Sequence, residues 1–470
     1  MDMTRLAKPD ICVIGAGSGG LSVAAGAAQL GARTILIERG EMGGDCLNFG
    51  CVPSKSLIAA ADAAHTIRTA GRFGVDAGTP AVDMARVRAH VRSVIARIAP
   101  HDSVERFEGL GVRVVREEGR FVAPDAVEAG DLRIEARRFV VAAGSRPAVP
   151  PIPGLDGVAH LTNETIFDLE RLPEHLLVVG AGPIGCELAQ AFRRLGSTVT
   201  AFDMGPMLPN DDPELVEVVR RALIAEGVNL REKVAIARIE PGPRVVLEGG
   251  EAIEGSDLLI AAGRKPNVEA LDLPRAGIET NARGIVTDAS LRTTNRRVYA
   301  IGDVAGRLQF THVAGHHGSL VIRHALFRLP VNVESAPVPW VTYTDPELAH
   351  VGLTEAGAKQ RGLAHQVIRI PFTGNDRALT EATDTGSLKL IASKRGRVLG
   401  VSIVGRHAGD LVLPWVLAIQ KKHKLSTLAS VIAPYPTRSE ITKRAAGSFY
   451  APKLFGSWSK RLVGFLTRFG

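Results

Sequence analysis

Cysteine is scarce in this sequence: the 470 residues contain four. So few cysteines exclude a secreted scaffold held together by disulfides, and a close pair in such a chain is more typical of redox chemistry or metal binding. The sequence also lacks a charged-then-apolar leader, and it lacks an apolar run of the roughly 18 residues that a membrane span requires. We therefore expect a cytoplasmic protein.

Acidic residues are missing from the last thirty positions, 441–470. This segment holds six Lys or Arg, so it carries +6 of the formal charge of +8 of the whole chain. Aromatic and aliphatic residues interleave with the basic ones, as in a short interfacial helix drawn to anionic lipid. Two possibilities stay open: contact with a membrane surface, and a helix docked on a partner subunit with a solvated basic face. No nucleic-acid recognition motif accompanies the charge, so we expect no nucleic-acid partner.

Two of the four cysteines, Cys46 and Cys51, lie five positions apart in "GGDCLNFGCVPSKSL". Zinc is a weak explanation, because neither a Cys-x2-Cys nor a second Cys/His pair accompanies them. In a regular α-helix their Cα atoms would be about 8–9 Å apart, whereas a disulfide requires about 4.4–6.8 Å. If the two cysteines form a redox pair, the chain between them must be irregular. The glycines between 43 and 50 permit such a segment, and we expect a helix to begin just after Cys51. Two ordinary buried thiols are the simpler alternative.

The position of each cysteine also predicts its ionisation. A thiolate near the N-terminus of the helix after Cys51 would be stabilised by the helix dipole, which lowers its pKa. Cys12 and Cys186 instead fall in an apolar strand and an apolar helix. We expect both of them to be small core residues.

Two copies of one nucleotide-binding pattern are present. Each copy has an apolar strand, a Gly-x-Gly-x-x-Gly turn, a helix, and a second strand that ends in an acid. The glycines let the backbone approach a pyrophosphate, the helix N-terminus offers N–H groups, and the acid accepts from ribose hydroxyls. The first glycine and the acid are 23 residues apart in both copies, which comprise Gly15, Gly17, Gly20 and Glu38, and Gly180, Gly182, Gly185 and Asp203. Two such folds suit one resident and one exchangeable dinucleotide, with hydride transfer between them.

The residues around the cysteine pair resemble the redox-active signature of the FAD-dependent pyridine nucleotide-disulfide oxidoreductases. This family contains dihydrolipoamide dehydrogenase, glutathione reductase and mercuric reductase, and the resemblance covers nearly the whole chain. Its other motifs are "VVAAGSRP" at 140–147 with Gly144, "IAAGRKPN" at 260–267 with Gly263, "RRVYAIGDVAG" at 296–306 and "VPWVTYTDPELAHVGLTE" at 338–355. We expect Gly144 and Gly263 to lie at the cofactors.

The resemblance implies an α/β fold with two Rossmann-like dinucleotide-binding domains and a C-terminal α+β dimerisation domain. The implied FAD-binding domain covers 1–150 and 276–335, the NAD-binding domain covers 151–275, and the dimerisation domain with the basic tail covers 336–470. The resemblance also implies a homodimer, in which Tyr435 of one subunit faces the cysteine pair of the other.

Site roles follow from the same resemblance. Cys51 matches the thiol that lies against the flavin of FAD, and Cys46 matches the thiol that exchanges with substrate. Lys55 matches a lysine near flavin N5, with Glu187 as its acidic partner. Asp303 matches the carboxylate that binds the ribityl chain. The implied reaction carries electrons from NADH through the flavin and the disulfide to a substrate, and the reverse order would oxidise a dithiol and make NADH.

The second nucleotide site favours NADH over NADPH. Asp203 can hold both hydroxyls of an NAD ribose and would repel a 2′-phosphate. The next residues, Met204 and Gly205, offer no cation for that phosphate.

The C-terminal motif departs from the family pattern. Dihydrolipoamide dehydrogenases carry His-Pro-Thr followed by a glutamate, the histidine being an acid-base catalyst. Here "APYPTRSE" keeps Pro436, Thr437 and Glu440, but Tyr435 stands at the histidine position. A phenol with an ordinary pKa of about 10 is a poor base at neutral pH, and loss of a positioned base typically costs about 10²- to 10⁴-fold in rate.

Three functions therefore stay open. The main prediction is an NADH-dependent disulfide oxidoreductase with dihydrolipoamide dehydrogenase-like chemistry. The second is a mercuric reductase-like metal reductase, since that group also places a tyrosine in this region. Against it, the chain has no cysteine after Cys186 and no Cys-x-x-Cys, although His316 and His317 could replace them as ligands or act as bases. The third is a redox-responsive flavoprotein that binds a membrane or protein partner.

Overall fold

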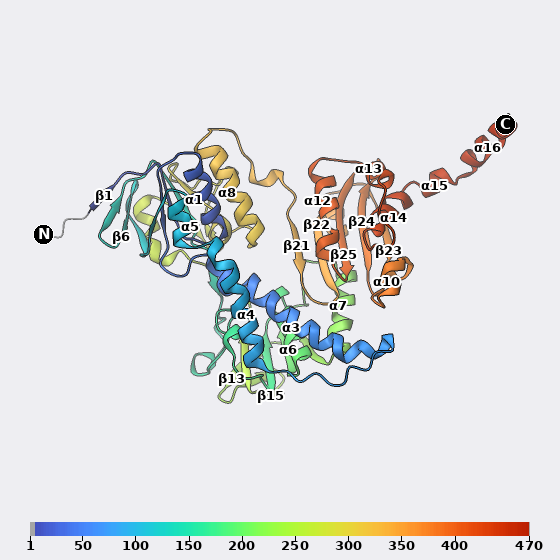
Figure 1. Ribbon diagram of the computed structural model, residues 1–470, viewed down its shortest axis with the longest axis horizontal. Coiled ribbons are helices and arrows are strands. Elements are labelled where there is room, and N and C mark those ends of the chain that lie inside the picture. The colour runs from blue at the N-terminus through green and yellow to red at the C-terminus, as the bar shows by residue number, and fades with distance from the viewer. Residues whose placement is uncertain (1–4, 470) are drawn as a thin grey trace. The chain divides into compact units, whose positions relative to one another are not determined.

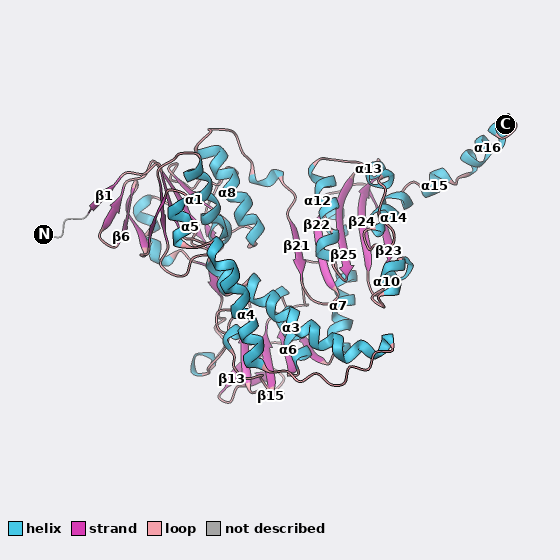
Figure 2. Ribbon diagram, in the orientation of Figure 1, coloured by secondary structure: helices cyan, strands magenta, loops and turns pink. Residues whose placement is uncertain are grey.

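The computed structural model describes residues 5–469, and these form two compact units. The first unit runs as far as Ala181 and resumes at Ala191–Met204 and Val234–Glu334. The second unit joins Gly182–Gln190, Gly205–Lys233 and the chain from Ser335 onward. Both units mix helices and strands (Figures 1 and 2), which confirms the α/β character that the sequence predicted.

The first unit is built around a five-stranded parallel sheet. Its strand order is β20-β8-β2-β3-β4, and every neighbouring pair is parallel. The strands are β2 (Ile11–Ile14), β3 (Thr34–Ile37), β4 (Val112–Val115), β8 (Arg138–Val141) and β20 (Val298–Ala300). Because β20 comes from the end of the unit, the chain returns to its first sheet after a long insertion.

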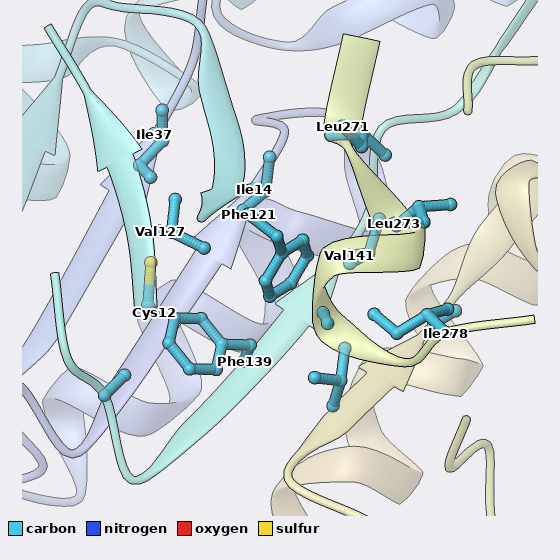
Figure 3. Packing of buried hydrophobic residues seen from close by; sticks show 14 of the residues in the cluster. Cys12, Ile14, Ile37, Phe121, Val127, Phe139, Val141, Leu271, Leu273 and Ile278 are labelled. Atoms are coloured by element: carbon cyan, nitrogen blue, oxygen red, sulfur yellow. The ribbon is translucent and has the colours of Figure 1, made fainter. Parts of the chain in front are cut away.

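Each face of this sheet is covered by its own hydrophobic core. Successive residues of a strand point to opposite faces, so Cys12 enters one core while Ile11 and Val13 enter the other. Figure 3 shows the first core, in which the rings of Phe121 and Phe139 meet edge to face at 5.5 Å. The covering elements are β1 (Arg5–Ala7), β5 (Gly119–Ala123), β6 (Ala126–Ala129) and β7 (Leu132–Ile134) on this side, and α1 (Ser18–Gln29), α5 (Val104–Gly109) and α8 (Thr311–Ala325) on the other.

Cys12 and Cys186 are core residues, as predicted. Their exposed fractions are 0% and 2%. Burial raises the pKa of the Cys12 thiol well above its usual range, which keeps this thiol neutral.

The second nucleotide-binding pattern starts from another parallel sheet of the first unit. Its central strand β10 (His175–Val179) pairs with β11 (Thr198–Asp203) and with β16 (Asp257–Ile260). The helix α6 (Pro183–Leu195) follows β10 in the chain and is divided between the two units. The unit also contains α4 (Met84–Ile98), an antiparallel sheet of β13 (Ile236–Glu240), β14 (Arg244–Leu247) and β15 (Ala252–Glu254), and a pair of β18 (Thr280–Asn281) and β19 (Gly284–Ile285).

The second unit is an α+β domain around a five-stranded antiparallel sheet. The strand order is β21-β22-β25-β24-β23. The strands are β21 (Pro339–Thr342), β22 (Glu347–Gly352), β23 (His365–Pro371), β24 (Ser387–Ser393) and β25 (Val398–Gly405). The other elements are α7 (Pro213–Ala225), β12 (Val228–Glu232), α9 (Glu355–Gln360), α10 (Asp376–Thr380), α11 (Ala408–Leu411), α12 (Leu413–Gln420), α13 (Leu425–Ser430), α14 (Glu440–Ser448), α15 (Ala451–Leu454) and α16 (Ser457–Leu466).

A buried lysine ties the segment around α7 to this sheet. The ammonium of Lys389, in β24, lies 2.8 Å from Asp212, 2.9 Å from Glu214 and 3.0 Å from Glu355, and its side chain is 5% exposed. Breaking such a buried pair by removing one partner typically costs about 3–5 kcal/mol. The cluster thus explains why residues 205–233 pack with the antiparallel sheet.

The predicted domain boundaries do not correspond to the two compact units. The three predicted domains therefore stay predictions. Among residues 5–469, no helix combines the length and the apolar character that crossing a membrane requires.

Candidate active site

The first glycine turn joins β2 to α1, and a carboxylate ties it to the end of β3. Glu38 accepts the N–H of Ala16 on Oε2 at 2.6 Å and the N–H of Gly40 on Oε1 at 2.7 Å. Gly15 has a φ of 105°, and a Cβ at this position would lie 2.4 Å from the carbonyl oxygen of Ala142. The turn therefore requires glycine here for both its conformation and its packing.

The second copy repeats this geometry closely. Asp203, at the end of β11, accepts the N–H of Ala181 on Oδ2 at 2.7 Å. Gly180 has a φ of 112°, and a Cβ there would lie 2.4 Å from the carbonyl oxygen of Ala261. The repeated spacing in the sequence thus corresponds to one turn built twice.

The first turn fits a dinucleotide pyrophosphate. A Cβ on Gly20 would lie 1.9 Å from the carbonyl oxygen of Gly15, so this glycine packs the helix against the turn. A Cβ on Gly17 would meet no atom within 4 Å, which leaves open space beside the first N–H groups of α1. These groups are the donors that would hold the pyrophosphate of the expected FAD.

Three predicted residues of the second copy belong to the second unit. A Cβ on Gly182 would meet no atom within 4 Å, and Gly185 and Glu187 are buried. Glu187 accepts the N–H of Tyr343 on Oε1 at 2.9 Å. The predicted pairing of Glu187 with Lys55 would join residues of different units, and it stays a prediction.

The redox segment consists of two helices separated by a break. Cys46 lies in α2 (Gly44–Asn48), and Cys51 is the first residue of α3 (Cys51–Thr69). The turn into α2 passes through Gly43, whose φ is 89°, and the Asn48 side chain donates to the carbonyl of Gly44 at 2.9 Å. The irregular segment that the cysteine spacing predicted is therefore present. The helix begins at Cys51 itself, one residue earlier than expected.

No disulfide joins Cys46 and Cys51 in this structure. All four cysteines lie within the described residues, and each carries a free thiol. The hydrogen bond from Cys46 lowers the pKa of Cys51 to about 6, helped by Thr311, whose hydroxyl lies 3.3 Å from the Cys51 sulfur, and by the charge of Lys55. The same hydrogen bond, together with burial, raises the pKa of Cys46 well above its usual range.

The opposite directions of the two pKa shifts favour the negative charge on Cys51 and the proton on Cys46. The sequence predicted a depressed pKa for a thiolate at this helix N-terminus, and the direction agrees. The largest cause of the lowered pKa is the hydrogen bond from the neighbouring thiol, followed by Thr311 and the charge of Lys55.

A polar network joins the redox segment to the carboxylate that was expected to bind the ribityl chain. Arg264 lies 3.0 Å from Asp45 through Nη2, and its Nε donates to the Ser145 hydroxyl at 2.7 Å. Ser145 in turn donates to Asp303 at 2.5 Å, and Asn163 donates to Asp45 at 3.1 Å. Burial raises the pKa of Asp303 despite the nearby Arg264. One arginine therefore offsets the charge of two carboxylates at the expected cofactor site.

Two motifs that the sequence assigned to different domains lie side by side. The strand β9 (Ser145–Pro147) pairs antiparallel with β17 (Arg264–Pro266). Gly144 and Gly263, with φ values of 66° and 120°, directly precede these strands. Sequence reasoning missed Ser145 and Arg264, although each directly follows a glycine that it singled out.

Tyr435 is tied to a carboxylate of its own unit. Its hydroxyl donates to Asp376 at 2.9 Å, and its side chain is 69% exposed. The bond to Asp376 raises the pKa of Tyr435 above its ordinary value, so an even smaller fraction of the phenol is ionised at neutral pH than the sequence alone suggested. Glu440, the first residue of α14, accepts the N–H of Thr437 at 3.4 Å.

His317 has a structural partner. It is 1% exposed, and its Nδ1 accepts the N–H of Gly302, the residue before Asp303, at 3.2 Å. Burial lowers the pKa of His317 to about 4, so its ring is neutral near pH 7. This histidine therefore supports the turn that carries Asp303. His316 is partly buried, and burial also lowers its pKa.

The role of Thr311 gives a testable prediction. Thr311→Val removes the hydroxyl beside the Cys51 sulfur, and a hydrogen bond to a charged group is worth about 1.5–3 kcal/mol. We expect the pKa of Cys51 to rise by about one unit, so that the thiolate is lost at a higher pH. The measurement is the pH midpoint of the long-wavelength thiolate-to-flavin absorption of the reduced enzyme. Thr66→Val is the control, because Thr66 is exposed and lies on the same helix as Cys51. Equal midpoints in both variants would contradict a role of the Thr311 hydroxyl in stabilising the Cys51 thiolate.

Comparisons with known proteins agree with this geometry. The family model of pyridine nucleotide-disulphide oxidoreductases matches residues 9–318, and the model of their dimerisation domain matches residues 338–446. A mercuric reductase of Bacillus cereus is 37% identical, over 94% of this chain and 71% of its own length. A dihydrolipoyl dehydrogenase of Thermus scotoductus is 35% identical, over 94% of this chain and 97% of its own.

A solved structure is similar over almost the whole chain. It is the Cu(II) complex of the HOCl-induced flavoprotein disulfide reductase RclA from Escherichia coli, with a TM-score of 0.84 and 27% identity. The match covers 92% of this chain and 98% of that one. The chain therefore belongs to the pyridine nucleotide-disulfide oxidoreductases, and it is an FAD-dependent, homodimeric enzyme that uses NAD(P)H.

Proposed function

We propose that this enzyme works as an NADH-dependent reductase that delivers electrons through Cys46 to a disulfide acceptor. The proposal is carried by the two thiols of the redox segment, whose pKa values shift in opposite directions, downward for Cys51 and upward for Cys46. Such a pair has one sulfur suited to an electrostatic contact with the bound cofactor. Its other sulfur is left to react with a substrate.

The proposed steps balance as NADH, a proton and a disulfide giving NAD⁺ and two thiols. FAD, when bound, supplies the two-electron carrier between NADH and the cysteine pair. Cys46 transfers its proton to the Cys51 thiolate and attacks the acceptor, so that a mixed disulfide forms and one substrate thiolate leaves. This thiolate takes the proton from Cys51, and the Cys51 thiolate then attacks the Cys46 sulfur. The second substrate thiolate leaves and takes a proton from solvent, and the Cys46–Cys51 disulfide is restored.

Tyr435 favours reduction of an acceptor over oxidation of a dithiol. A dithiol substrate must lose its protons before exchange, and family members use a histidine for this step. Here the phenol donates a hydrogen bond to Asp376 and has a raised pKa, so it keeps its proton and offers no base for a substrate proton near pH 7. The enzyme would therefore oxidise dihydrolipoamide slowly near pH 7.

A soft metal ion is a second candidate substrate. The support is that relatives at 33–37% identity are mercuric reductases, and that the similar RclA structure is a Cu(II) complex. Two adjacent thiols are suitable ligands for such an ion, because thiolates bind soft metals and release their protons directly without a separate base. The reaction would convert NADH and Hg(II) into NAD⁺, a proton and elemental mercury.

A redox-responsive flavoprotein with incidental turnover is the weaker proposal. The chain retains both thiols, the two nucleotide-binding turns and the polar network around Asp303. These are the parts that catalysis needs, and a protein whose role was only to bind a partner would not require all of them.

Asp203 provides a test of the cofactor preference. Because a carboxylate repels a ribose 2′-phosphate, kcat/KM for NADH should exceed that for NADPH by at least about tenfold. Asp203→Asn keeps an oxygen that can accept the Ala181 N–H, so the turn should survive while the preference falls toward equality. Equal efficiency of the wild-type enzyme with both nucleotides would contradict a role of Asp203 at the ribose. Unchanged FAD content serves as the control for folding.

Tyr435 provides a test of the direction of the reaction. We expect wild-type oxidation of dihydrolipoamide to be slow at pH 7 and to rise toward alkaline pH, as substrate thiols ionise unaided. Tyr435→His should raise the rate at pH 7 by at least about tenfold, the lower part of the range for a general base. Tyr435→Phe is the control, because it also breaks the bond to Asp376 but supplies no base.

The same variants separate the two candidate substrates. NADH-driven reduction of Hg(II) should be equal or slower in Tyr435→His and in Tyr435→Phe. Rapid wild-type turnover of dihydrolipoamide at pH 7, with no gain from histidine, would mean that another group supplies the base.

A further inference from the structure

The chain ends in a short, exposed helical segment that the catalytic function does not use. We call residues 451–469, which comprise α15 and α16, the C-terminal tail. Figure 1 shows these two helices continuing beyond α14, the last helix packed on the antiparallel sheet. The match to the dimerisation-domain model ends at residue 446, so the tail lies outside that matched domain.

The helix α16 and the residues after it gather their large apolar side chains on one face. One residue advances about 100° around an α-helix, so positions i, i+4, i+7, i+8 and i+11 share one side. These positions are occupied by Trp458, Leu462, Phe465, Leu466 and Phe469. Lys460 lies on the opposite side, Arg461 lies at the edge of the apolar side, and Arg468 follows the end of the helix.

The apolar face is not covered by the rest of its unit. Trp458 is 73% exposed, Phe465 is 55% exposed and Phe469 is 75% exposed. Monomeric proteins rarely expose a contiguous row of large apolar side chains unless the row binds something. The rings of Phe465 and Phe469 contact each other edge to face at 5.1 Å, so they form one continuous surface.

Charge decides which partner fits this surface. The last thirty residues contain six Lys or Arg and no Asp or Glu, whereas the rest of the chain carries a formal charge of +2, the difference between +8 and +6. Basic residues around an apolar face complement an anionic lipid surface, where the rings enter the headgroup boundary and the cations meet phosphates. A second copy of the dimerisation domain offers no complementary charge, because residues 336–440 themselves carry a formal charge of +5, from 13 Lys or Arg and 8 Asp or Glu.

We propose that the C-terminal tail docks the enzyme on an anionic membrane surface, with α16 lying in the plane of the interface. The face from Trp458 to Phe469 enters the boundary between headgroups and acyl chains. Lys460, Arg461 and Arg468 remain at the headgroups. This binding is independent of the reaction at the cysteine pair, so it holds for either candidate substrate.

Vesicle flotation of the purified holoenzyme tests the proposal. Vesicles of phosphatidylcholine alone are compared with vesicles that also contain phosphatidylglycerol. The enzyme should float with the anionic vesicles and remain in solution with the neutral ones. Added salt should weaken the binding, because it screens the attraction between Lys or Arg and the lipid phosphates.

Matched variants separate the tail from the rest of the surface. Leu462→Ser should weaken binding to anionic vesicles at least about fivefold, because one apolar side chain would no longer be buried in the lipid. Leu363→Ser is the matched control, since both leucines are 40% exposed, and it should leave vesicle binding unchanged. The double variant Lys460→Glu and Arg461→Glu should weaken binding at least about tenfold. The same exchange at Lys394 and Arg395, an exposed Lys-Arg pair of the second unit, should have little effect.

NADH oxidation with a disulfide acceptor and FAD content should be unchanged in all four variants. Equal binding to neutral and anionic vesicles, or equal binding of tail and control variants, would overturn the proposal. A tail variant that shifts the dimer toward monomer in sedimentation, with no vesicle binding by the wild type, would also overturn it and would identify the partner subunit as the cover.

Discussion

The hydrogen bond between the thiols of Cys46 and Cys51 is the interaction on which the chemistry of this enzyme depends. It places the charge on Cys51, beside Lys55 and Thr311, and it leaves the proton on Cys46. Two cysteines five residues apart could not meet in a continuous helix. The break between α2 and α3 is therefore as important for the acidity of Cys51 as the charges around it.

The redox segment is held in place by charge as well as by backbone geometry. Asp45, next to Cys46, shares Arg264 with Ser145, which in turn donates to Asp303. Two carboxylates in a poorly solvated region would repel each other without this arginine. A single side chain from β17 thus connects the thiols to the expected cofactor carboxylate.

Much of this arrangement could be predicted from the sequence, and the reason is that its determinants are local. A glycine turn and its acid lie within 23 residues of each other in both copies, and the same hydrogen bond, to Ala16 or to Ala181, forms in each. The break at the cysteine pair is also local, since spacing and glycines alone required it. The burial of Cys12 and Cys186 followed from the apolar residues around them.

The features that sequence reasoning missed all depend on contacts between distant parts of the chain. Arg264 reaches Asp45 across more than two hundred residues, and no local pattern records that distance. The packing of residues 205–233 with the antiparallel sheet depends on Lys389, which is a single charge in a strand. The raised pKa of Tyr435 likewise depends on Asp376, which sequence analysis had no reason to pair with it.

Anaerobic titration with NADH tests the central claim, the asymmetry of the two thiols, most directly. The account predicts that the wild-type enzyme and Cys46→Ser develop a long-wavelength thiolate-to-flavin absorption on reduction or at rest, because both retain the Cys51 thiolate. Cys51→Ser should keep its FAD but lack this absorption at every pH. Persistence of the band in Cys51→Ser, together with its loss in Cys46→Ser, would contradict the account, because the charge would then lie on Cys46.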